Sequence, residues 1–163
     1  MDIQTRVMPA GLERGECVPQ AAVDILMMTC GLQPREDDVL DETILHDAAL
    51  MAVISLVGDV GWSVFIGIPQ GTAEPLVQKF AGFEVPFDSP DMCDAIGELC
   101  NIFAGDIKAK LDAQGVRAEI SLPSVTRGEK LSMLFPKHSP VHRSTFSTDL
   151  GKLLIGVGAK SAA

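Results

Sequence analysis

The sequence is poor in basic side chains, in aromatic residues and in long apolar runs. It has 13 Lys and Arg against 22 Asp and Glu, a net charge of −9 and only 5% aromatic residues. A nucleic-acid-binding protein needs Lys and Arg clustered on one face to displace counterions from phosphates, and an anionic membrane surface would repel this chain. We therefore expect neither nucleic acid nor a membrane as a partner.

Targeting and membrane-spanning segments are also missing. The start, Met1–Arg6, leads into a polar stretch instead of an apolar run, which does not fit a secretory signal. The longest apolar segments, at 25–28 and 48–57, are far shorter than the roughly 20 residues of a transmembrane helix. We expect a cytoplasmic protein.

Cysteine and histidine lack the spacing of redox pairs or metal sites. No two of the four cysteines form a C-x-x-C pair, so reduced, buried thiols are expected. His138 and His142 are four residues apart, but Pro140 between them argues against a helix that presents both to one metal ion. No metal site is predicted. The cysteines are Cys17, Cys30, Cys93 and Cys100.

What the sequence does have is enough apolar residues for one buried core. With 163 residues, of which 47% are hydrophobic, the chain suits a single domain. Residues 1–17 lack periodicity and are predicted to form a flexible N-terminal arm, and 18–163 a single domain. Acidic side chains crowd residues 36–42, where the spacing does not match an EF-hand and a solvated connection is expected.

The order of the predicted elements favours an α+β fold with a mostly antiparallel sheet and long helices packed against it. A helix over 18–30 ends at Gly31 and is followed by a hairpin of two β-branched runs. Thr72 is expected to cap a short helix, and Ser89-Pro90 to open a long one that closes at Gln114-Gly115. The predicted strands are 52–57, 62–68, 118–122, 130–135, 143–147 and 153–157.

The long helix has two faces. At about 100° per residue, five polar or small side chains fall within about 40° of the direction of Asp94. They are Asp94, Glu98, Asn101, Gly105 and Lys108. The opposite side is apolar and can be buried without them. Its residues are Ile96, Leu99, Cys100, Phe103, Ile107 and Leu111.

Two of these five residues are poor choices for a helix interior. Asn101 is the only asparagine of the chain, and asparagine favours caps and turns because its amide competes for backbone groups. Gly105 costs about 1 kcal/mol relative to alanine. A surface built to engage a partner would explain both residues. An ordinary solvated face, with Asn101 bonded to a nearby loop, would also explain them, and the pattern alone leaves both interpretations open.

Beyond this pattern, the run 94–105 resembles the signature helix of the CheC/CheX/FliY family of chemotaxis phosphatases, in which Glu and Asn stand three residues apart. The likeness extends to the hairpin of 54–67, to 120–128 and to the closing hairpin of 146–157. Roughly residues 18–158 are covered. CheC-type members carry two such motifs, and with a single asparagine this chain is similar to the CheX type.

The resemblance implies a CheC-like fold and a phosphatase acting on the aspartyl phosphate of a CheY-like receiver domain. Asn101 would orient the attacking water, and Glu98 would pair with the receiver lysine, so both are the predicted catalytic residues. Asp94, Gly105 and Lys108 are predicted to bind the partner. The protein would need no cofactor of its own, because the receiver supplies Mg²⁺. A homodimer is implied as well. The alternative is a non-catalytic CheC-like binding or assembly module in chemotaxis or flagellar signalling.

Overall fold

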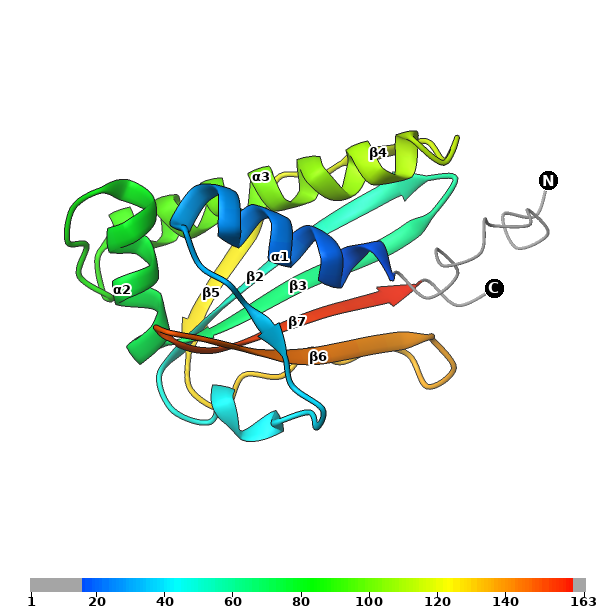
Figure 1. Cartoon of the computed structure of the whole chain (residues 1–163). Helices are drawn as coiled ribbons and strands as arrows, with labels where there is room; N and C mark the ends of the chain where they lie inside the picture. The colour runs from blue at the N-terminus through cyan, green and yellow to red at the C-terminus, as the bar shows by residue number, and fades with distance from the viewer. Residues whose placement is uncertain (1–15, 160–163) are drawn as a thin grey trace.

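The computed structural model describes residues 16–159, in which an antiparallel sheet carries three α-helices on one face (Figure 1). The strand order is β1-β6-β7-β3-β2-β4, and β5 also pairs with β2. This is an α+β fold, as predicted. The helices are α1 (Cys17–Cys30), α2 (Gln70–Ala81), α3 (Pro90–Asp112) and the short 3-10 helix η2 (Glu42–Leu45). The strands are β1 (Arg35–Glu36), β2 (Ala49–Gly58), β3 (Gly61–Pro69), β4 (Ala118–Ile120), β5 (Ser124–Gly128), β6 (Val141–Thr148) and β7 (Gly151–Ala159).

Local sequence signals set most helix ends. Gly31 and Gly82 end α1 and α2 in the left-handed conformation that glycine adopts without strain. The Ser89 hydroxyl accepts a hydrogen bond from the Met92 amide at 3.3 Å and so caps α3. No helix within residues 16–159 is long and apolar enough to cross a bilayer. Most of the predicted arm, 1–15, lies outside the described residues.

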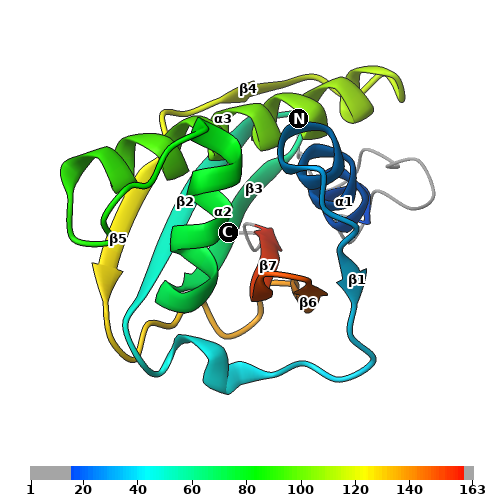
Figure 2. The same ribbon diagram turned by 60° about the vertical axis from the view of Figure 1, so that its left-hand side comes forward.

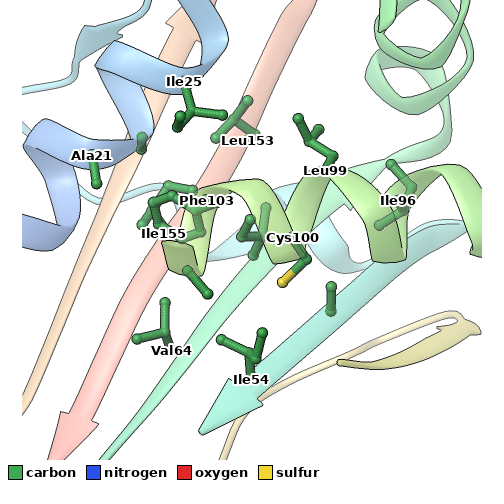
Figure 3. Close-up of a cluster of buried hydrophobic side chains, with 14 of the residues drawn as sticks. Ala21, Ile25, Ile54, Val64, Ile96, Leu99, Cys100, Phe103, Leu153 and Ile155 are labelled. Carbon is green, nitrogen blue, oxygen red and sulfur yellow. The ribbon is translucent and has the colours of Figure 1, made fainter. Parts of the chain in front are cut away.

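The main core lies between the helices and the sheet. The apolar sides of α1 and α3 meet β2, β3 and β7 there, and Ile25, Phe103 and Ile155 point toward one another in Figure 3. Every residue predicted for the apolar side of the long helix is buried. Since a buried helix face is fixed in rotation by its packing, the core also determines which side of α3 is exposed.

The opposite face of the sheet is covered by irregular chain. A smaller cluster of Leu45, Met51 and Phe65 lies there, and Phe135 packs against Phe65 with ring centroids 5.8 Å apart. A Cβ at Gly158 would lie 2.1 Å from the Phe135 ring, so that position has to remain glycine for the aromatic ring to fit. Because the central strands are buried on both faces, they are apolar along most of their length.

The acidic segment over 36–42 is only in part the solvated connection that the sequence predicts, because Glu36, Asp38 and Glu42 are exposed whereas Asp37 is held against the sheet. The Asp37 amide donates to Thr145 O at 2.8 Å, and the Ser147 hydroxyl donates to Asp37 Oδ1 at 2.7 Å. Lys152 Nζ lies 3.5 Å from Asp37 and 3.7 Å from Asp41. The hydroxyl and the lysine hold the pKa of Asp37 below its usual range, in that order of importance.

Two further predictions are wrong. Residues 130–135 form no strand: Lys130 adopts a φ of +51°, and the chain after it passes under the sheet to place Phe135. Thr72 is not a cap, because α2 begins two residues earlier and the Thr72 hydroxyl donates to Lys152 O at 2.9 Å. In both cases a contact distant in sequence overrode the local signal.

The buried thiol of Cys100 makes the stability of the fold depend on alkaline pH. Burial raises its pKa from 9.0 to about 12, because the thiolate would lose its hydration. The unfolded chain therefore releases this proton near pH 9 while the folded chain keeps it, so the free energy of unfolding falls as pH rises from 9 toward 12.

We predict that Cys100→Ala weakens this dependence by up to about 1.4 kcal/mol per pH unit. Urea unfolding of both proteins at pH 7.5 and above pH 10 measures it. The methyl-sized cavity lowers stability equally at every pH, and the half-buried Cys17, whose pKa burial raises to about 11, is present in both proteins. Parallel stability curves would contradict the prediction.

Candidate functional site

A stripe of five residues, which we call the α3 stripe, lies on the solvent side of α3, opposite the core: Asp94, Glu98, Asn101, Gly105 and Lys108. Asp94, Glu98, Asn101 and Gly105 are all exposed. Within residues 16–159, the structure records no hydrogen bond or ion pair for the Glu98 carboxylate or the Asn101 amide. Residues three apart on a helix have Cβ atoms about 5–6 Å from each other. A carboxylate and an amide are thus presented side by side on a rigid helix.

Asp94 and Glu98 place two like charges one helical turn apart. Such a pair destabilises an isolated helix by a few tenths of a kcal/mol. The bases of the second half of α3 are engaged elsewhere, so they do not relieve this repulsion. The pair therefore adds nothing to the stability of the helix.

Lys108 differs from the other four residues of the α3 stripe. It is half-buried, and its amine donates to Ala118 O at 2.8 Å and lies 3.4 Å from the Asp112 carboxylate. These contacts fasten β4 to the flank of α3. As a partner-binding residue, Lys108 would have to exchange them for contacts with the partner.

Gly105 is not required by the packing of the protein itself. A Cβ built at this position meets nothing within 4 Å, and the helix would gain stability from alanine. Gly97, one residue before Glu98, is buried, and a Cβ there would touch Pro123 at 3.7 Å. Gly105 therefore leaves space on the exposed surface of α3, whereas Gly97 lies against Pro123 in the link between β4 and β5.

The other flank of α3 is fastened to α1. Lys110 Nζ lies 2.8 Å from Asp24 and 2.7 Å from Asp106. Hydrogen bonds from Lys110 and then Gln20 lower the pKa of Asp24, and the two carboxylates raise the pKa of Lys110. Asp24 on α1 is thereby used to position α3.

Leu122 lies in the link between β4 and β5, directly before Pro123, and no pattern in the sequence singles it out. Its side chain is 87% exposed, the highest value among the large apolar residues of the described chain that are exposed. The available signal was Pro123 inside a strand-like run, because proline interrupts the hydrogen bonding of a sheet. A break in the strand was therefore predictable, but not the direction of Leu122.

The main cavity is remote from the α3 stripe. It has a volume of about 460 Å³, lies on the opposite face of the sheet, and is lined by Leu45, Phe65, Lys130, Leu131 and Arg143 among others. None of the predicted site residues lines it. Small substrates are usually bound in concave pockets, whereas Glu98 and Asn101 project from a convex helix. Their chemistry therefore suits a macromolecule that brings its own concave site.

An exposed amide and carboxylate can perform a limited set of tasks. The amide can hold a water molecule through one donor and one acceptor, and the carboxylate can pair with a cation. Among the described residues, no three His, Cys, Asp or Glu gather in a way that could hold a metal ion. The arrangement suits orientation and docking at a site that a partner completes.

Comparison with solved structures shows the same fold in chemotaxis proteins. A CheX from Desulfovibrio desulfuricans has a TM-score of 0.77 at 22% identity, covering 91% of this chain and 100% of its own. A CheX from Vibrio vulnificus has a TM-score of 0.80 at 18% identity, covering 93% and 99%. The CheX of a CheX–CheY–BeF₃–Mg²⁺ complex from Borrelia burgdorferi has a TM-score of 0.73 at 20% identity, covering 92% and 99%.

The family model of chemotaxis phosphatase CheX matches residues 50–147, which is more than half of the chain. No curated protein matches the sequence. The matched region includes the central hairpin, all of α3, and the strands β4, β5 and most of β6. It therefore contains the whole α3 stripe and the chain that lies along its flank. This protein belongs to the CheX family of chemotaxis phosphatases.

Proposed function

We propose that this protein accelerates hydrolysis of the aspartyl phosphate of a CheY-like receiver domain. The observation that carries the proposal is the exposure of Glu98 and Asn101 on one face of a helix that is fixed on both flanks. Membership of a phosphatase family supports the reaction. The Borrelia burgdorferi CheX, whose structure contains CheY, BeF₃ and Mg²⁺, supports the class of partner.

Asn101 is proposed to orient the water that attacks phosphorus. In this hydrolysis the water oxygen bonds to phosphorus, the bond from phosphorus to the aspartyl oxygen breaks, and the aspartate leaves as a carboxylate. Transition states of phosphoryl transfer are loose and need little covalent help, so correct placement of the water is itself an effective form of catalysis. The amide carbonyl accepts a hydrogen bond from this water and holds it in line with the breaking bond.

Glu98 is proposed to pair with the receiver lysine and so to set how the helix lies across the phosphorylation site. A carboxylate three residues from Asn101 fixes the distance between the docking contact and the oriented water. Gly105 lies one turn beyond Asn101 and has no side chain, so the receiver could come close to the helix backbone there. Asp94 and Lys108 are placed at the two ends of this contact.

The receiver would supply the Mg²⁺ that neutralises charge on its own phosphoryl group, and this protein would contribute only its side chains. Receiver domains act inside the cell, so a cytoplasmic location belongs to the same proposal. A role in chemotaxis follows from the family. The signalling pathway depends on which receiver the protein binds. Phosphate release from a panel of phosphorylated receivers of the same genome would identify that receiver.

We predict that Asn101→Ala lowers kcat for dephosphorylation by about 100-fold, because the attacking water is no longer held in line. Stability should change by only a few tenths of a kcal/mol, since an exposed asparagine adds little to a helix. Phosphate release from a phosphorylated receiver measures the rate, and urea unfolding measures the stability. Full activity of the variant would contradict the mechanism.

Glu98→Gln is the contrasting variant in the same assay. It keeps the shape of the side chain and removes the charge, so it should raise KM more than it lowers kcat and weaken the dependence of KM on salt. If the wild-type protein binds the phosphorylated receiver without accelerating phosphate release, the alternative hypothesis of a non-catalytic binding module is correct.

We predict that Gly105→Ala raises the free energy of unfolding by about 1 kcal/mol and raises KM for the phosphorylated receiver. The methyl group meets nothing in the protein itself but narrows the approach of the partner. Gly71→Ala is the matched control, because a Cβ in this first turn of α2 also meets nothing within 4 Å. It should leave KM unchanged. An unchanged KM for Gly105→Ala would remove this glycine from the docking surface.

We also propose that the protein is a homodimer, as the resemblance to CheX-type proteins implies. Sedimentation velocity should then give twice the chain mass of 17.3 kDa at concentrations from about 1 to 100 µM. A monomer throughout this range would contradict the proposal. The α3 stripe lies on one chain, so the catalytic proposal does not depend on this result.

A further inference from the structure

The edge of the sheet beside α3 contains a β-bulge at Ser121–Pro123. β2 pairs with β4 in a register that sets Leu56 opposite Ile120, and with β5 in a register that sets Val53 opposite Ser124. Two residues of β2 therefore face three residues of the link. One extra residue in an edge strand is the signature of a bulge, which redirects a side chain and is frequent near functional sites.

The bulge reverses which positions of the edge face the helices. Before it, Ala118 and Ile120 pack into the core beneath α3, and after it Val125 does so. The Ser121 amide donates to Ser55 O at 2.9 Å, and its hydroxyl accepts from the Ser55 amide at 2.9 Å. Ser121 thus forms the hydrogen bonds with the Ser55 backbone that a regularly paired strand residue would form. Leu122, the next residue, is 87% exposed.

Leu122 is placed next to the catalytic pair by two contacts along the flank of α3. Lys108 bonds Ala118 O, and Pro123 lies against Gly97. Eleven helical residues and five extended residues both span about 16.5 Å, so the two segments run alongside each other between these contacts. One residue before Pro123, Leu122 lies level with the turn that carries Glu98 and Asn101. Figure 2 shows β4 running alongside α3, whereas β5 leads away from the helix.

The link is also stiff. The residue before a proline is restricted to extended conformations, so Leu122 loses little conformational freedom when a partner covers it. An exposed ion pair such as the one proposed for Glu98 raises affinity by about a few-fold, whereas burying a leucine side chain raises it by about tenfold or more. A polar stripe that orients a partner therefore needs an apolar contact beside it to hold that partner.

We propose that Leu122 is the apolar anchor that holds the receiver domain against the α3 stripe, by packing on an apolar patch that borders the receiver's phosphorylation site. This inference rests on the proposed function. In this division of roles, Leu122 at the bulge holds the receiver and sets its position along α3, and Asn101 orients the attacking water. Leu122 is thus a positioning residue that contributes equally to the ground state and the transition state.

The test compares Leu122→Ser with Leu134→Ser. Leu134 is 84% exposed but follows Met133 and precedes Phe135 in the chain that covers the opposite face of the sheet, so it is a control matched in type and exposure. We expect Leu122→Ser to raise KM for the phosphorylated receiver by about tenfold with kcat unchanged. Its Kd for the receiver activated with beryllofluoride and Mg²⁺ should rise equally. Leu134→Ser should change neither constant.

The outcomes separate this inference from the proposed function. An unchanged KM and Kd for Leu122→Ser, with an active wild-type protein, overturns the anchor and leaves the phosphatase proposal intact. Binding that weakens in Leu122→Ser, with no phosphate release by the wild-type protein, supports the anchor and overturns the phosphatase. An equal loss of affinity in Leu134→Ser also overturns the anchor. Thermal unfolding of both variants, expected at the wild-type midpoint, shows that each is folded.

Discussion

The packing of one side of α3 into the core is the interaction on which the candidate site depends. Ile96, Leu99 and Phe103 are fixed between α1 and the sheet, and this burial fixes the rotation of the helix about its axis. Lys110 fastens one flank to α1, and Lys108 fastens the other flank to β4. With rotation and both flanks fixed, the direction of every exposed side chain on the outer face is set before any partner arrives. Preorganisation of this kind is what catalysis by positioning requires.

A site on a convex helix divides the chemistry between two proteins. In the proposed function, the receiver would bring the phosphoryl group, the metal ion and the concave surface, and this protein would bring a carboxylate, an amide and an apolar anchor. Such a division explains why the cavity of about 460 Å³ plays no part and why the acidic net charge is tolerated. The excess of acidic groups does not attract an anionic substrate, and a single contact with a receiver lysine needs one carboxylate in the right place.

Sequence reasoning succeeded where the signal was local. The periodicity of the long helix identified its buried and exposed sides, Ser89 and Gly31 marked helix ends, and two β-branched runs gave the central hairpin. It failed where a distant contact decided the outcome. Residues 130–135 have the composition of a strand, but Phe135 is used to cover Phe65. The acidic segment looked solvated, but Lys152 and Ser147 hold Asp37 against the sheet.

The sequence by itself determined the composition of the α3 stripe, because the angle between helical residues is a property of the backbone alone. It also determined the family resemblance, through Glu98, Asn101 and the runs around them. Only the tertiary structure decided that Lys108 is tied to Ala118, that Gly105 faces open space, and that Leu122 is exposed at a bulge in the edge of the sheet. Strand register and bulges arise from pairing between segments far apart in the chain, so no local pattern could have placed them.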